Sequence, residues 1–215
     1  MLEKRIIPVG PFAANCIVLW GEERKAWIID PGADADIIES FLGSKNLIPC
    51  LAAYTHGHFD HVNASIALAK RWPSLAFHVG RGDEPMLGHP ANCWPPDYVP
   101  MPRPANLVCD LEEGSVLEGG GINAHILHTP GHTPGGVCFH FEEDKLLLTG
   151  DTLFAGSCGR TDFPGGSMKQ LQNSLARLKT LPPETEVVAG HGLPTTIGRE
   201  IAQNPYLQGE GAFYE

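Results

Sequence analysis

The sequence has no long hydrophobic run and few basic residues. No apolar stretch of the 215-residue chain approaches the roughly 20 residues that a membrane helix needs, so we expect no membrane partner. Fifteen Lys and Arg against 25 Asp and Glu give a formal net charge of −10, which disfavours nucleic acids and anionic lipid surfaces as partners. A small anionic substrate stays compatible with this charge, because a local basic pocket can lie on an acidic surface.

The chain also lacks any CxxC pair, an internal repeat and a break in composition. Its cysteines are therefore expected to be free thiols in a reducing compartment, and its length predicts one domain over residues 1–215. Residues 1–5 lead into a strand-like segment rather than a signal peptide, so we expect a cytoplasmic protein. The six cysteines are Cys16, Cys50, Cys93, Cys109, Cys138 and Cys158.

Apolar runs that alternate with helical patterns predict an α/β fold with a buried sheet. A first helix is expected to start at Asp34 or Asp36 and to stop near Gly43, and a second to run from Val62 to Trp72. In the second half, Ser167 followed by Gln170 resembles a capping box that opens a further helix. The expected strands cover residues 5–9, 15–20, 25–30, 47–54, 75–79, 107–110, 115–117, 122–127, 137–141, 145–149 and 186–189.

The segment Thr55-His56-Gly57-His58-Phe59-Asp60-His61 is the most informative stretch of the sequence. Four of its seven residues can bind metal, since imidazole and carboxylate groups suit zinc, iron and related cations. The segment lies where an apolar strand ends and a helical pattern begins, a common location for chemistry on a rigid scaffold. An incidental turn would rarely gather three histidines and an aspartate within six positions, so we predict a metal site.

Further candidate ligands follow other strands. His132 lies in a turn between two prolines, and a rigid backbone suits a ligand that must not move. Asp151 stands at the tip of an apolar strand, where a buried carboxylate is costly unless it is paired or bound to metal. His191 follows the last expected strand, between two glycines. Asp30, in Asp-Pro-Gly, is expected either to support the site from behind or to form the turn.

The order His56-x-His58-x-Asp60-His61, then His132, Asp151 and His191, resembles the metallo-β-lactamase superfamily. The resemblance runs through nearly the whole chain and implies an αββα sandwich, in which two mixed sheets lie face to face with helices outside. The metal site then lies at one edge of the sandwich, between the sheets.

The resemblance also implies two metal sites. The first would consist of His56, His58 and His132, and the second of Asp60, His61 and His191, with Asp151 bridging them. Two divalent ions about 3.5–4 Å apart can share a hydroxide whose pKa falls toward roughly 7, which supplies a nucleophile at neutral pH. Zinc is expected, with iron and manganese as alternatives for the same ligands. Asp60 is also expected to act in catalysis by orienting the hydroxide.

Within the superfamily, the segments Gly131–Gly135 and Cys158–Arg160 resemble the glyoxalase II branch, in its short bacterial form. This implies hydrolysis of the thioester S-D-lactoylglutathione to D-lactate and glutathione, with Arg160 at the position of a basic residue that holds a glutathione carboxylate. A structural salt bridge between Arg160 and Asp162 is the alternative. The chain ends about two dozen residues after His191, so we expect the family's C-terminal helical domain to be missing. The tyrosine that follows the basic residue in longer members is absent, and Thr161-Asp162-Phe163 stands there.

The main alternative to the glyoxalase II branch is the persulfide dioxygenase family. That family shares the segment Gly159-Arg160-Thr161-Asp162-Phe163 and uses a single iron and dioxygen. A metal-binding module without catalysis is disfavoured, because structural zinc sites are usually closed with four ligands. A nuclease and a true β-lactamase are less expected for a short acidic chain without a secretion signal. Residues 85–104 are rich in proline and could form either a lid over the site or a loop packed on the surface. Cys158 could be either a reactive thiol or a packed one.

Overall fold

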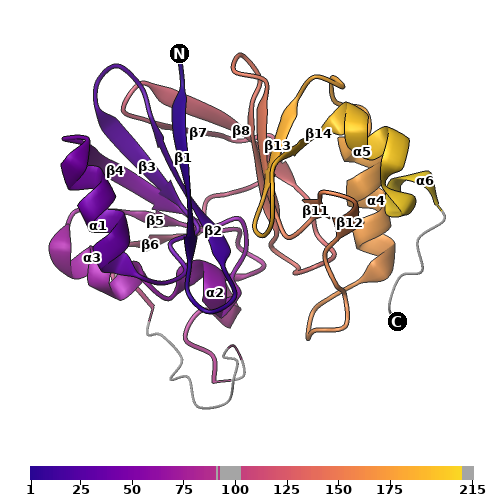
Figure 1. Cartoon of the computed structure of the whole chain (residues 1–215). Coiled ribbons are helices and arrows are strands. Elements are labelled where there is room, and N and C mark those ends of the chain that lie inside the picture. The colour runs from indigo at the N-terminus through magenta and orange to yellow at the C-terminus, as the bar shows by residue number, and fades with distance from the viewer. Residues whose placement is uncertain (91, 93–102, 210–215) are drawn as a thin grey trace.

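Two six-stranded β-sheets form the centre of the fold, and helices lie on their outer sides (Figure 1). The structure, a computed structural model, describes residues 1–90, 92 and 103–209. The first sheet has the order β1 (Glu3–Val9), β2 (Ala14–Trp20), β3 (Lys25–Ile29), β4 (Ile48–Ala53), β5 (Phe77–His78) and β6 (Leu107–Val108). Its first three strands are antiparallel, and β3 to β6 run parallel.

The second sheet is also mixed. Its order is β14 (Thr195–Thr196), β13 (Glu186–Ala189), β10 (Leu146–Gly150), β9 (Val137–Phe141), β8 (Ile122–His128) and β7 (Val116–Gly119). Only β10 and β13 pair in parallel. A small hairpin of β11 (Leu153–Phe154) and β12 (Ser157–Cys158) follows β10.

The helices divide between the two sheets, with α2 (Phe59–Val62) at the lower edge of the first sheet in Figure 1. Beside the first sheet are α1 (Ala35–Ser44) and α3 (Ser65–Arg71). The short 3-10 turn η1 (Glu84–Met86) follows β5 in the chain. Beside the second sheet are α4 (Met168–Leu178), α5 (Ile197–Gln203) and α6 (Pro205–Gln208). No helix in the described part of the chain is long and apolar enough to span a membrane.

Three apolar clusters hold these layers together. Ile28 and Phe77 pack with Ile38 and Leu68 under α1 and α3. The sheets face each other through a second cluster that includes Trp27, Phe139 and Leu148. The third cluster places Leu147 and Val187 under α4 and α5, where Leu171, Leu175 and Leu178 repeat at helical spacing. Each such leucine contributes about 1.5–3 kcal/mol when fully buried. The αββα sandwich predicted from the resemblance is confirmed.

One local prediction needed correction. The helix expected over Val62–Trp72 is interrupted: α2 begins inside the metal motif, and Ala64 donates its N–H to Pro31 O at 2.9 Å before α3 starts. The turn after β3 therefore holds α2 in place. The segment that starts at Thr195 forms β14 and two helices, because Thr196 and Asn204 cap α5 and α6 with side-chain oxygens.

Other predictions have mixed outcomes. The helix cap at Ser167 is present, with its oxygen accepting from Gln170 N at 3.4 Å. The proposed lid over residues 85–104 falls largely on residues 93–102, which lie outside the described residues, so the lid stays a prediction.

Candidate metal centre

All the predicted ligands follow strands that end at the same edge of the sandwich. The segment from His56 to His61 follows β4, and His132 lies between β8 and β9. Asp151 follows β10, and His191 follows β13. Backbone hydrogen bonds tie the two sheets together here: Val137 N donates to Thr55 O at 2.8 Å, and Asn15 N donates to Gly190 O at 2.7 Å. These bonds bring ligands from both sheets to one place.

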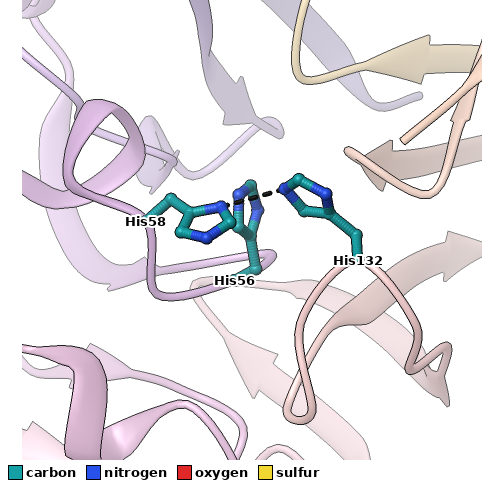
Figure 2. Close-up of side chains that lie close together, drawn as sticks. All are labelled: His56, His58 and His132. Atoms are coloured by element: carbon teal, nitrogen blue, oxygen red, sulfur yellow. Dashed lines mark hydrogen bonds between the residues drawn. The ribbon is translucent and has the colours of Figure 1, made fainter. Parts of the chain in front are cut away.

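The seven side chains form three overlapping groups of potential ligands. Within each group, one ligand atom per residue lies within 4.8 Å of the others. Figure 2 shows one group, in which His58 Nδ1 lies 2.9 Å from His132 Nε2 with the His56 ring beside them. The three-histidine group is His56, His58 and His132; the acidic group is Asp60, His61 and His191; the third joins His56, His61 and Asp151.

Asp151 lies between the three-histidine group and the acidic group. Its Oδ1 is 3.7 Å from His61 Nε2. Its Oδ2 is 3.6 Å from His132 Nε2 and 3.7 Å from His191 Nε2. One carboxylate thus faces histidines of both groups, which is the position expected of a bridging ligand.

Outer partners orient the histidine rings. Asp30 Oδ2 accepts from His61 Nδ1 at 3.0 Å, Arg160 O accepts from His132 Nδ1 at 2.7 Å, and Phe12 O accepts from His191 Nδ1 at 3.1 Å. Carbonyl and carboxylate oxygens can only accept, so each Nδ1 carries the proton. The Nε2 lone pairs are left to point into the centre, as in metal-binding histidines generally.

Asp30 combines both roles considered for it. It has a positive φ of 53° at the turn after β3, and its fully buried carboxylate also accepts from Thr55 N at 2.7 Å and Thr55 Oγ1 at 2.6 Å. The backbone of Asp30 therefore forms the turn, and its carboxylate holds the start of the metal motif.

Three buried polar atoms at the centre have no hydrogen-bond partner within the structure: His56 Nε2, His61 Nε2 and Asp151 Oδ1. Orphaned buried polar atoms are costly, and three in one place call for a ligand. Burial and the neighbouring histidines lower the pKa of His56 well below its usual value, and burial and His132 lower that of His58 to about 3. Neutral imidazoles and convergent carboxylates are the donor set that a divalent metal ion requires.

The acidic side of the centre attracts positive charge. Burial acts to lower the pKa of His61, but the nearby carboxylates, Asp30 and Asp151 foremost, outweigh it and raise the pKa to about 10. Burial likewise opposes the rise at His191, whose pKa is raised by Asp60 and Asp151. The same carboxylates favour a metal cation, which would displace these protons.

Arg160 lies beside the centre but outside the ligand groups. Its Nε and Nη2 donate to the two carboxylate oxygens of Asp162 at 2.6 and 2.5 Å, so the salt bridge considered as an alternative is present. Its guanidinium carbon is 4.2 Å from the centroid of the Phe163 ring, which in turn lies 5.4 Å from the His58 ring. Burial raises the pKa of Cys158 to about 12, which favours the packed thiol over the reactive one.

Two buried polar residues near the centre were missed at the sequence level. Asn15 is the one polar residue in the apolar run of β2, and its Nδ2 donates to Ala189 O at 2.9 Å and Gly192 O at 3.0 Å beside His191. Its position in that run was an available signal. Asp83 follows β5 in a glycine-rich turn, and nothing in its local pattern distinguishes it from a surface turn residue.

The chain is similar to known proteins over most of its length. The chain is 38% identical over 208 residues to the hydroxyacylglutathione hydrolase GloC of Haemophilus influenzae, covering 94% of this chain and 96% of that one. The crystal structure of the BLEG-1 B3 metallo-beta-lactamase has a TM-score of 0.89 and 34% identity over 95% of this chain and 99% of that chain. A structure of TTHA1623 in a di-iron-bound form has a TM-score of 0.85 and 37% identity, over 94% and 100%.

A family model described as the Metallo-beta-lactamase superfamily matches residues 9–191. That range contains all seven candidate ligands and ends at the last of them. The fold, the ligand order and the match together show that this chain is a member of the metallo-beta-lactamase superfamily.

Proposed function

We propose that the protein is a thioester hydrolase of the hydroxyacylglutathione hydrolase (glyoxalase II) type that works with two divalent metal ions. The observation that carries the proposal is the presence of two complete ligand groups with Asp151 between them. The similarity to GloC along 94% of the chain supports the choice of thioester.

The ligand assignment follows from the donor atoms. His56, His58 and His132 would hold one ion, Asp60, His61 and His191 the other, and Asp151 would contact both. Zinc is proposed, with iron or manganese as alternatives, because imidazole and carboxylate accept all three. Bound metal would supply a water of lowered pKa and polarise the thioester carbonyl.

The protein's own groups prepare this site in three ways. The Nδ1 hydrogen bonds to Asp30, Arg160 O and Phe12 O keep the imidazoles in one tautomer and one orientation. Without bound metal, burial acts to raise the pKa of Asp60, but its hydrogen bond with His191 and the charge of His61 outweigh burial and lower it. An ionised Asp60 can accept a hydrogen bond from the attacking water.

The substrate's own chemistry limits what else the protein must do. A thiolate is a good leaving group, so a dedicated general acid is not needed. Arg160 is the proposed contact for a carboxylate of glutathione, and it would have to exchange its bidentate partner Asp162 for the substrate. The proposed partner is thus a small glutathione thioester, bound at the edge of the sandwich.

A second candidate is the persulfide dioxygenase reaction. It is favoured by Gly159-Arg160-Thr161-Asp162-Phe163, which resembles that family almost residue for residue. Three histidine nitrogens with Asp151 beside them also offer the mixed imidazole and carboxylate set on which non-haem iron enzymes rely.

One experiment on the purified protein separates the candidates. Metals are quantified per chain, and the same preparation is assayed with S-D-lactoylglutathione, with glutathione persulfide under oxygen monitoring, and with a chromogenic β-lactam. Two metals per chain with thioester hydrolysis as the fastest reaction supports the proposal. One iron per chain with oxygen uptake, or β-lactam hydrolysis faster than thioester hydrolysis, overturns it.

A further inference from the structure

Asp83 is a fully buried carboxylate that contacts both loops carrying the three-histidine group, although it is not itself a ligand. It stands just before η1, in the loop that follows β5 of the first sheet. Gly57 N donates to its Oδ2 at 2.9 Å, and Thr133 Oγ1 donates to the same oxygen at 2.7 Å. Gly135 N donates to its Oδ1 at 2.5 Å.

The groups that donate to Asp83 lie next to the three histidines in the sequence. Gly57 lies between His56 and His58, and Thr133 follows His132 directly. The first two histidines come from the end of a strand in the first sheet and the third from a loop of the second sheet, as the two sides of Figure 2 show. One carboxylate oxygen therefore links the two halves of the three-histidine group across the sandwich.

The backbone has been brought very close to Asp83 on both sides. A Cβ at Gly135 would lie 2.3 Å from Asp83 N, and a Cβ at Gly57 would lie 3.0 Å from Asp83 O. Asn92 adds a further tie, since its Nδ2 donates to Gly57 O at 2.7 Å. A side chain at Gly57 or Gly135 would push its loop away from Asp83. The distance between the two metal-binding loops therefore depends on their close contact with Asp83.

Burying this charge has a cost that the fold must offset. Desolvation raises the pKa of Asp83, and the hydrogen bonds from Thr133, Gly57 and Gly135 act against that rise. A buried carboxylate is retained only where its hydrogen bonds compensate its desolvation. Those three bonds all go to the two metal-binding loops.

We propose that Asp83 is a positioning residue that sets the distance between the His56–His58 side and the His132 side of the three-histidine group, and thereby the metal affinity of that group. The inference rests on the ligand assignment of the proposed function but not on the identity of the substrate. Its effect would reach the metal through the backbone of Gly57 and through Thr133, because the hydrogen bonds that the described residues make to Asp83 come from Gly57, Thr133 and Gly135 and not from the ligand side chains.

The test is Asp83→Asn in the full chain, loaded with Co²⁺. The amide keeps the shape but turns one oxygen into an NH₂ group. Whichever way it faces, Gly57 N or Gly135 N then loses its acceptor. Changes to groups that support metal ligands typically cost about 10–100-fold in metal affinity. We expect a loss of this size for one of the two ions in competition with a chelator, together with a changed visible spectrum of the remaining cobalt.

Glu200→Gln is the matched control. Glu200 is also buried, and it accepts from Gly156 N at 2.7 Å, Thr195 Oγ1 at 2.6 Å and Asn204 Nδ2 at 2.8 Å. Glu200 supports the α5 region and not the loops that carry the three histidines. Glu200→Gln should therefore lower the melting temperature without selectively weakening the binding of one metal ion. Equal metal affinities in both variants would show that Asp83 only stabilises the fold, which overturns the proposal.

Thr133 provides a second, milder pair of variants. Thr133→Ser keeps the hydroxyl donor and should bind cobalt like the wild type, whereas Thr133→Val removes it and should weaken one ion. If Asp83→Asn does not fold, the two Thr133 variants provide the test. Identical cobalt affinities of Thr133→Ser and Thr133→Val would overturn the proposal. A wild-type chain that binds no cobalt would instead overturn the ligand assignment itself.

Discussion

Gly190 is a position where one added methyl group should damage the metal centre directly. A Cβ built there would lie 2.2 Å from Asp151 Oδ1 and 2.8 Å from His61 Cε1. Ordinary van der Waals contact begins near 3.4 Å, so Asp151 would have to move by about 1 Å. Metal–ligand distances tolerate changes of only about 0.2 Å, so Gly190→Ala should lose metal.

The expected size follows from overpacking. Forcing an extra methyl group into a filled site costs roughly 1–3 kcal/mol in free energy of unfolding. For a chain of this length, each kcal/mol lowers the melting temperature by about 2–4 °C. We therefore expect a melting temperature reduced by roughly 2–12 °C, together with weaker binding of both ions, because Asp151 faces both groups.

The assay is metal content per chain, measured after dialysis against a weak chelator, with thermal unfolding of the same samples. Gly43→Ala is the matched control, since a Cβ at Gly43 in α1 meets no atom within 4 Å. That change should leave metal binding unaltered and raise stability by about 0.5–1 kcal/mol, because alanine favours a helix. A Gly190→Ala protein that keeps both metals with wild-type affinity would refute the placement of Asp151 in the centre.

Three further predictions concern groups around the centre. Asp30→Asn should weaken metal binding about 10–100-fold, since His61 loses its charged acceptor, and normal metal content after the same dialysis would contradict this. Arg160→Ala should raise KM for glutathione thioesters far more than it lowers kcat, and an unchanged KM in steady-state assays would remove its proposed role in substrate binding. In the folded chain, the hydrogen bond from Arg177 lowers the pKa of Glu113. The ionised carboxylate therefore stabilises the fold at pH values above the unfolded pKa of about 4.3, and this stabilisation is lost as the pH falls through the lowered pKa of the folded state. Glu113→Gln should thus lower the free energy of unfolding at pH 7 by less than about 1 kcal/mol for an exposed pair, and thermal unfolding should show this difference shrink as the pH falls through the lowered pKa; an equal loss at neutral and at strongly acid pH would contradict the linkage.

The sequence carried the main features of fold and site because both depend on local patterns. Apolar runs with period two or continuous burial located most strands, and the five histidines in strand-end motifs located the ligands. The resemblance supplied the sandwich, which periodicity alone does not specify. Errors fell where contacts distant in the chain decided the outcome. The break between α2 and α3, for example, follows from the contact of Ala64 with Pro31.

Only the tertiary structure could reveal the groups that support the ligands. Asp83 is 26 residues from Gly57 and 50 from Thr133 along the chain, and no local pattern marks a carboxylate that two distant loops share. The pairing of Arg160 with Asp162 was one of the two roles expected for Arg160, since the residues stand two positions apart, but whether the pair forms depends on how the loop folds.

The sequence by itself determined which residue types can bind metal and at which strand ends they stand, because strands and ligand chemistry are local properties. The tertiary structure decided how far apart the ligands of the two sheets lie, which imidazole nitrogen faces the centre and which buried carboxylates hold the loops. Those quantities depend on contacts between segments far apart in the chain, such as Asn15 with Gly190 and Thr55 with Val137. Such contacts exist only once both sheets have packed against each other.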